Sequence, residues 1–132
     1  MSIFVLATDV ITITFFTGKS KNGEDIYCDP EEASLKEVNE DLDPDSIEKH
    51  SCTFRRPSYE DSVTFADGSM EVVAGELRLN PARADMKRIT TLLKSWTFKD
   101  ADGKPVPVEP HIIASLAPEV GAVIAYLLNK KI

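Results

Sequence analysis

The side chains of this chain that are best suited to hold a metal ion belong to Cys28, His50, Cys52 and His111. Thiolates and imidazoles are the usual ligands of structural zinc, and such sites combine two pairs of ligands that are each close in sequence. Here only His50 and Cys52 form a close pair. We therefore predict two half-buried thiols and a surface histidine, and we expect no metal or other cofactor.

A cysteine nucleophile activated by a histidine is the other chemistry open to Cys28 or Cys52. Nothing in the sequence places a base beside either thiol, and His50 is too close to Cys52 along the chain to face it from a strand. The carboxylates add little, because most of them lie in one run that water can solvate. We therefore expect that the protein is not an enzyme.

Two short segments look like ligand-binding loops. Residues 17–20 read Thr-Gly-Lys-Ser, but the glycine that a phosphate-binding loop needs five positions before Gly18 is replaced by Ile13. Residues 98–109 place a glycine and a glutamate as a calcium-binding loop does, but Phe98 occupies the first ligand position. We predict simple turns at both places.

The elements that must position these residues begin with a β-hairpin. Residues 10–16 are rich in β-branched and aromatic side chains, which predicts a strand. Asn22-Gly23 predicts a turn, and residues 25–28 can return as the second strand. A lone hairpin is marginal in water, so this one must pack on something else. Residues 51–54 predict a further short strand, and Asp29 followed by proline is typical of a helix start.

The middle of the chain allows two interpretations. In the first, Ser58 caps a helix that carries Tyr59 and Val63 on one face. In the second, residues 62–65 form a strand, and residues 70–73 form another that pairs with it. The pattern alone leaves both interpretations open.

The clearest helix signal lies in residues 80–98. Asn80 is a typical N-cap residue, and the proline after it suits the first helical position. Apolar residues recur at spacings of four and three as far as Trp96, so the predicted helix includes it. After a polar turn and a proline-rich connector, we predict a short helix at 110–116 and a last helix at 118–129.

These elements predict an α+β fold in which an N-terminal β-hairpin or small antiparallel sheet packs with two or three C-terminal helices. A length of 132 residues is typical of one domain, so residues 1–132 are expected to form a single domain. Its first part, residues 1–53, is predicted to be β-rich and to contain an acidic segment. Residues 54–132 are predicted to be mostly helical.

The formal net charge is −7, and it is concentrated in one segment. Residues 24–61 carry thirteen acidic and four basic side chains, whereas the flanking parts are nearly balanced. Because phosphate binding needs clustered lysine and arginine, we expect no direct contact with nucleic acid. The apolar N-terminus is too short for a membrane span and has no signal-peptide pattern, so we expect no membrane contact and a cytoplasmic origin.

Several residues are candidates for contact with a partner. The apolar N-terminal run is expected to be exposed and could dock on a neighbour by adding a strand to its sheet; it consists of Ile3, Phe4, Val5 and Leu6. The other candidates are Arg55, Arg56, Tyr59 and Trp96. The competing interpretations are pairing of the arginines with the acidic segment and a core position for the tryptophan.

The order of motifs in the second half resembles that of a known class of proteins. The motifs are RRPSYEDS at 55–62, LNP at 79–81, LLKSW at 92–96, DADGKPVPV at 100–108 and LAPEV at 116–120. This order, over about residues 54–128, resembles small proteins encoded among the virion structural genes of tailed bacteriophages. The N-terminal hairpin and the acidic segment lie outside the resemblance.

The resemblance implies a structural or assembly component of a phage particle, such as a head, neck or tail accessory protein or a tail assembly chaperone. Its partners would be other phage structural proteins, met in multiple copies in a symmetric assembly. It would be found in the virion, or in the host cytoplasm during assembly. The acidic segment suggests an alternative function, a DNA-mimic inhibitor of a host nucleic-acid-binding protein, because spaced carboxylates can imitate phosphates.

Overall fold

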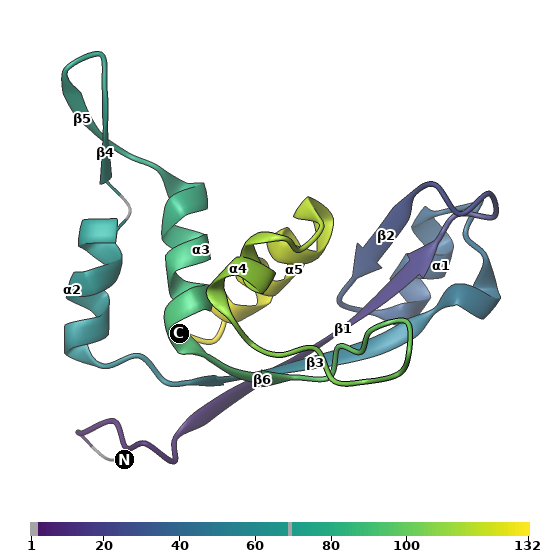
Figure 1. Cartoon of the computed structure of the whole chain (residues 1–132), viewed down its shortest axis with the longest axis horizontal. Helices are drawn as coiled ribbons and strands as arrows, with labels where there is room; N and C mark the ends of the chain where they lie inside the picture. Colours follow the sequence, from purple (N-terminus) through teal and green to yellow (C-terminus); the bar gives the residue numbers. More distant parts are fainter. Residues whose placement is uncertain (1–2, 69) are drawn as a thin grey trace.

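A four-stranded antiparallel sheet forms the base of the molecule in the computed structural model, which describes residues 3–68 and 70–132 (Figure 1). The strand order is β2-β1-β3-β6, and three helices pack over one face of the sheet: α3 (Pro81–Leu92), α4 (Pro110–Ala114) and α5 (Pro118–Asn129). The fold class is therefore α+β, as the sequence predicts. The strands are β1 (Val10–Lys19), β2 (Ile26–Asp29), β3 (Glu48–Arg55) and β6 (Leu93–Trp96).

Strand β1 organises the sheet because it is long enough to pair on both sides. It pairs with β3 over eight positions and with β2 over the last four, which confirms the predicted N-terminal hairpin. Its buried side chains are Ile11, Ile13 and Phe15, while Thr12 between them is exposed. This alternation with period two points the apolar face of the strand at the helices. Gly23 has φ of 76°, a left-handed conformation that glycine adopts easily in the turn to β2.

Residues 24–48 of the acidic segment form a small lobe beside one end of β1. It contains the helix α1 (Glu32–Val38) and the 3-10 turn η1 (Pro44–Ser46). The predicted helix start at Asp29 is wrong, because this carboxylate instead accepts a hydrogen bond from the Glu31 amide (2.9 Å) just before the helix. Leu42 packs over Gly18, where an added Cβ would lie 2.5 Å from Cδ1 of Leu42. The predicted turn at residues 17–20 is wrong, because residues 17–19 end β1 and pair with β2. Gly18 instead makes room for the lobe.

The middle of the chain follows the first of the two interpretations. Residues 59–68 form the helix α2 (Tyr59–Gly68), so the alternative strand at 62–65 is wrong. Strand β4 (Met70–Val73) lies where the second interpretation places a strand, but it pairs with β5 (Glu76–Leu79), for which no strand was predicted. Figure 1 shows that this β4–β5 hairpin projects from the body of the molecule.

The second half supplies three helices: α3 (Pro81–Leu92), α4 (Pro110–Ala114) and α5 (Pro118–Asn129). The predicted N-cap is confirmed, since Asn80 Oδ1 accepts a hydrogen bond from the Arg83 amide (3.2 Å). The predicted extension of this helix through residue 98 is wrong. The chain turns extended after Leu92 because β6 pairs there with β3, where Trp96 lies opposite Cys52.

The hydrophobic core lies between the sheet and the helices. Phe15 and Phe54 from the sheet, Leu92 from α3, and Ile124 and Leu128 from α5 are all at most 1% exposed. α2 packs on the outer side of α3, where Phe65 joins the same cluster.

Among the described residues, no helix combines the length and the apolar character that crossing a bilayer demands.

Candidate functional site: exposed interaction surfaces

The two cysteines are unbridged and shielded. Cys52 is fully buried in β3, and Cys28 in β2 is half-buried. Burial raises the pKa of both thiols to about 12, because the thiolate loses its hydration. Both thiols therefore stay protonated at neutral pH, whereas a nucleophilic cysteine needs a lowered pKa.

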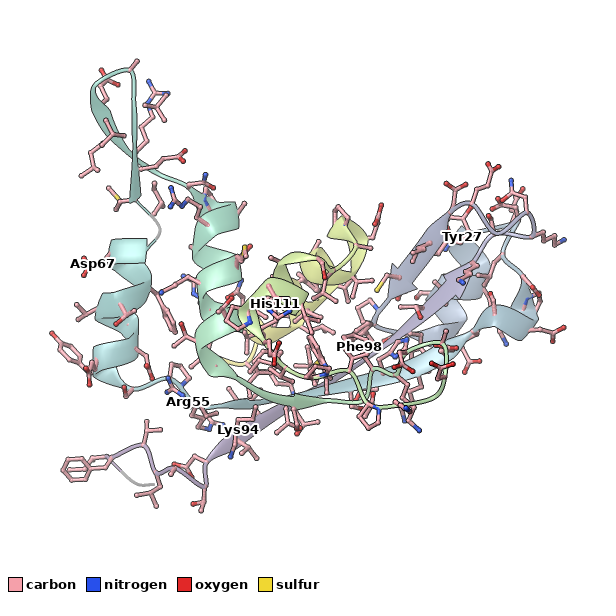
Figure 2. The ribbon with its side chains drawn as sticks, in the orientation of Figure 1. Tyr27, Arg55, Asp67, Lys94, Phe98 and His111 are labelled. Carbon is pink, nitrogen blue, oxygen red and sulfur yellow. The ribbon has the colours of Figure 1, made fainter. Side chains whose placement is uncertain are left out.

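His50 is not a surface histidine. Its Nε2 lies 2.7 Å from Thr17 Oγ1, and its ring packs against Phe15 and Phe98. Burial lowers the pKa of His50, which outweighs the opposite effect of Glu48, so the ring is neutral at neutral pH. His111 lies apart on α4 (Figure 2). In the part of the chain that the structure describes, no three histidine, cysteine or carboxylate side chains come together as metal ligands.

Arg55 is held in an ion pair at the junction of β3 and α2 (Figure 2). Its guanidinium donates to both carboxylate oxygens of Asp61, with Nη2 2.9 Å from Oδ1. Ser58 completes the cluster as a reciprocal helix cap: its amide donates to the Asp61 carboxylate (2.8 Å), and its Oγ accepts from the Asp61 amide (3.2 Å). These contacts hold the pKa of Asp61 well below its usual range.

The other three candidates, Arg56, Tyr59 and Trp96, differ from Arg55 in their surroundings. Arg56 and Tyr59 are exposed, with 87% of Tyr59 open to solvent, so both are available to a partner. Trp96 is half-buried on β6, its Nε1–H donates to the Val106 carbonyl (2.7 Å), and its ring contacts Phe98. Trp96 thus packs at the edge of the core rather than at the end of a helix.

The N-terminal residues 3–6, here called the arm, are exposed. Their exposed fractions run from 45% at Val5 to 90% at Ile3. A turn joins the arm to β1: the Asp9 amide donates to the Leu6 carbonyl (3.0 Å), and the Leu6 amide donates to Asp9 Oδ2 (2.8 Å). The turn directs the arm away from the sheet, so the predicted exposure of these four apolar side chains is confirmed.

The β4–β5 hairpin is a second exposed apolar element, and it is not among the predicted contact sites. Val72, Leu77 and Leu79 are 71%, 66% and 64% exposed. The alternation Glu-Leu-Arg-Leu at 76–79 was the available signal, since period-two alternation is typical of a strand with one apolar face.

A third surface, the acidic lobe (residues 24–48), lies at the other end of the sheet. It carries eleven carboxylates, and nine of them belong to exposed residues. Hydrogen bonds tie its loop to the end of β1 and the residues just after it, from the Lys21 amide to the Asp41 carbonyl (2.8 Å) and from the Asp43 amide to the Lys19 carbonyl (2.9 Å). Tyr27, labelled in Figure 2, donates to Asp41 Oδ1 (2.6 Å), and this bond raises its pKa to about 12.

Comparison with protein-family models, with curated proteins and with solved structures finds no match for this chain. The candidate contact residues form two groups: the four arm residues, and Arg55, Arg56 and Tyr59 around the start of α2. Trp96 lies apart from both groups, at the edge of the core.

Proposed function

We propose that the chain is a structural or assembly component of a tailed bacteriophage particle and acts through protein–protein contacts. It would serve as a head, neck or tail accessory protein or as a tail assembly chaperone. The motif order over residues 54–128 supports the class of protein, and the exposed surfaces support the mode of action.

The observation that carries the proposal is the pair of exposed apolar elements, the arm and the β4–β5 hairpin. Soluble monomers rarely leave contiguous apolar patches open to water, and such patches mark contact sites. A two-stranded hairpin is also marginal unless it packs on another surface. Both elements are therefore suited to be covered by other subunits.

Quantitative mass spectrometry of purified phage particles and of assembly intermediates tests the proposal. We expect the chain in a fixed ratio to the other virion proteins, and present in several copies per particle. Detection in intermediates alone would select the assembly chaperone among the proposed roles. A chain missing from both fractions would contradict the proposal, with a phage replication enzyme as the control for contamination.

The exposed acidic lobe supports a second candidate, the DNA-mimic inhibitor. Carboxylates spaced over one surface can occupy the basic groove of a nucleic-acid-binding protein. Binding to a panel of basic host nucleases should weaken steeply as salt rises, and Glu31→Gln with Glu32→Gln should weaken it further. Binding that is insensitive to salt, or no binding at all, would exclude this function.

A further inference from the structure

The β4–β5 hairpin has one apolar and one charged face. Its register places Met70 opposite Leu79 and Val72 opposite Leu77, so these four side chains share a face. The other face holds Val73 and Glu76, and Glu71 opposite Arg78. The charges of this face are paired within the chain, Arg78 with Glu76 (3.1 Å) and Arg83 of α3 with Glu71 (3.8 Å). The apolar face, in contrast, leaves Val72, Leu77 and Leu79 largely open to solvent.

Strand β5 also has an open edge. All four of its residues are exposed, and among residues 3–68 and 70–132 its only strand partner is β4. The strands are joined by the two-residue turn Ala74-Gly75, both residues of which have positive φ. In such a hairpin the pair next to the turn is hydrogen-bonded and the following pair is not. The backbone N–H and C=O groups of Leu77 and Leu79 therefore point away from β4.

We propose that the arm of a second copy of this chain adds to the open edge of β5 as a third strand. This inference rests on the proposed function, since it specifies how copies of the chain contact one another. The arm has four residues, as β4 and β5 each have, and residues 3–8 contain no charged side chain. Side chains alternate along a strand, so either Ile3 and Val5 or Phe4 and Leu6 would lie on the apolar face of the hairpin.

A third strand would stabilise the hairpin. Three strands with an apolar face are stable where two are not, and strand addition supplies main-chain hydrogen bonds together with side-chain contacts. The arm of the same molecule leaves the body on the side of the sheet away from the hairpin (Figure 1). The donor must therefore be another copy.

The apolar face of the hairpin is too small for a simpler dimer in which two hairpins pack face to face. Burying one side chain of this size removes roughly 60–120 Å² from water, as its transfer free energy implies. With Val72, Leu77 and Leu79 about two-thirds exposed, the hairpin face offers roughly 120–240 Å². A stable interface needs about 800 Å² per partner. A strand donated by the arm adds its own apolar area and its backbone bonds, and each copy makes two such contacts.

Donor and acceptor lie on different parts of the molecule, so the contact is heterologous. Heterologous contacts build closed rings when the rotation between copies closes and filaments when it does not. Each copy can give an arm and receive one, so closing a ring adds a further contact to the stability that a single contact supplies.

Sedimentation velocity of the full chain over a range of concentrations tests this proposal. The arm variant is Ile3→Ser with Val5→Ser, and the hairpin variant is Val72→Thr with Leu77→Thr, which keeps a good strand propensity. Each should raise the dissociation constant for self-association by more than about tenfold. Val73→Thr is the matched control, because Val73 is the neighbouring valine on the opposite face; it should change the constant by less than about twofold.

Mixing the two variants gives the sharpest result. Each alone lacks one half of the contact, but the hairpin variant can still donate its arm to the intact hairpin of the arm variant. We expect a one-to-one complex in the mixture and monomers in the separate samples. All substituted positions are exposed, and circular dichroism checks that the variants fold.

Four results would overturn the inference: a wild-type chain that stays monomeric, variants that associate as the wild type does, a mixture without complex, or an equal loss in Val73→Thr. These results leave the proposed function standing if particles contain the chain. A chain that associates as expected but is absent from particles and intermediates would contradict the proposed function alone.

Discussion

Phe15→Ala is expected to lower the free energy of unfolding by about 3–5 kcal/mol, the range found when a buried phenylalanine is truncated in a core. Phe15 is fully buried on the central strand, and its ring contacts the rings of His50 and Phe98. Alanine would leave a cavity between the sheet and the loop that follows β6. Urea unfolding followed by the fluorescence of Trp96, the only tryptophan, measures the change.

Phe16→Ala provides the matched control for this experiment. Phe16 is the next residue in the same strand, but it is half-buried and points to the face opposite Phe15. We expect its truncation to cost about 1 kcal/mol, since a partly exposed side chain loses less on removal. Equal losses for the two variants would contradict the assignment of the core to the face that carries α3 and α5.

Asp61→Ala is expected to cost about 2–3 kcal/mol at neutral pH, because it leaves the Arg55 guanidinium unpaired and removes the helix cap shared with Ser58. The figure is below that of a fully buried pair because 38% of the Arg55 side chain is open to solvent, which screens the charge. A double-mutant cycle with Arg55→Ala, measured by urea unfolding, isolates the ion pair. An interaction energy near zero would contradict its role.

The same carboxylate predicts how stability depends on pH. The folded pKa of Asp61 lies below its ordinary value of 3.8, mainly because of the hydrogen bonds from Arg55. The stabilisation is therefore fully present above that pH and is lost as the pH falls below it. We expect the difference in stability between wild type and Asp61→Asn to be constant from pH 7 to about 5 and to shrink below about 3.8. A constant difference down to pH 2 would contradict the assignment.

Local sequence patterns predicted the elements whose formation depends on nearby residues. The β-branched run that forms β1 and the Asn80 cap of α3 are such cases, since each acts within a few residues of itself. Ser58 and Asp61 also form a local capping pair, which is why the helix interpretation of the middle segment is correct.

The end of α3 could not be predicted in the same way. Leu93 and Trp96 continue the apolar spacing of the helix, so periodicity alone extends it. The chain leaves the helix because β3, about forty residues earlier, offers an edge on which Leu93–Trp96 can pair. The tertiary pairing with β3 outweighs the local preference for helix, and the pattern of a single sequence indicates only the local preference.

Among the candidate contact residues, too, some features could be predicted from the sequence and others could not. The arm was predicted as an exposed contact site, and the alternation that indicates β5 is present in the sequence although no strand was predicted there. The surroundings of Arg55 and Trp96 could not be predicted, because the sequence does not show which groups they contact. Arg55 pairs with Asp61, and the Trp96 Nε1–H donates to the Val106 carbonyl.

The strand order also sets the sequence of events as the chain is made. Thr12 lies beside Thr53, 41 residues later, and Ser51 bonds with Thr97, 46 residues later, whereas the β4–β5 hairpin closes over a two-residue turn. Contacts so distant along the chain form slowly compared with local ones. In a growing chain, the local contacts of α2 and of the β4–β5 hairpin can therefore begin to form before β3 pairs with β6. Until Leu93–Trp96 has left the ribosome, the edge of β3 is open to mispairing, and this interval is when the nascent protein most needs protection.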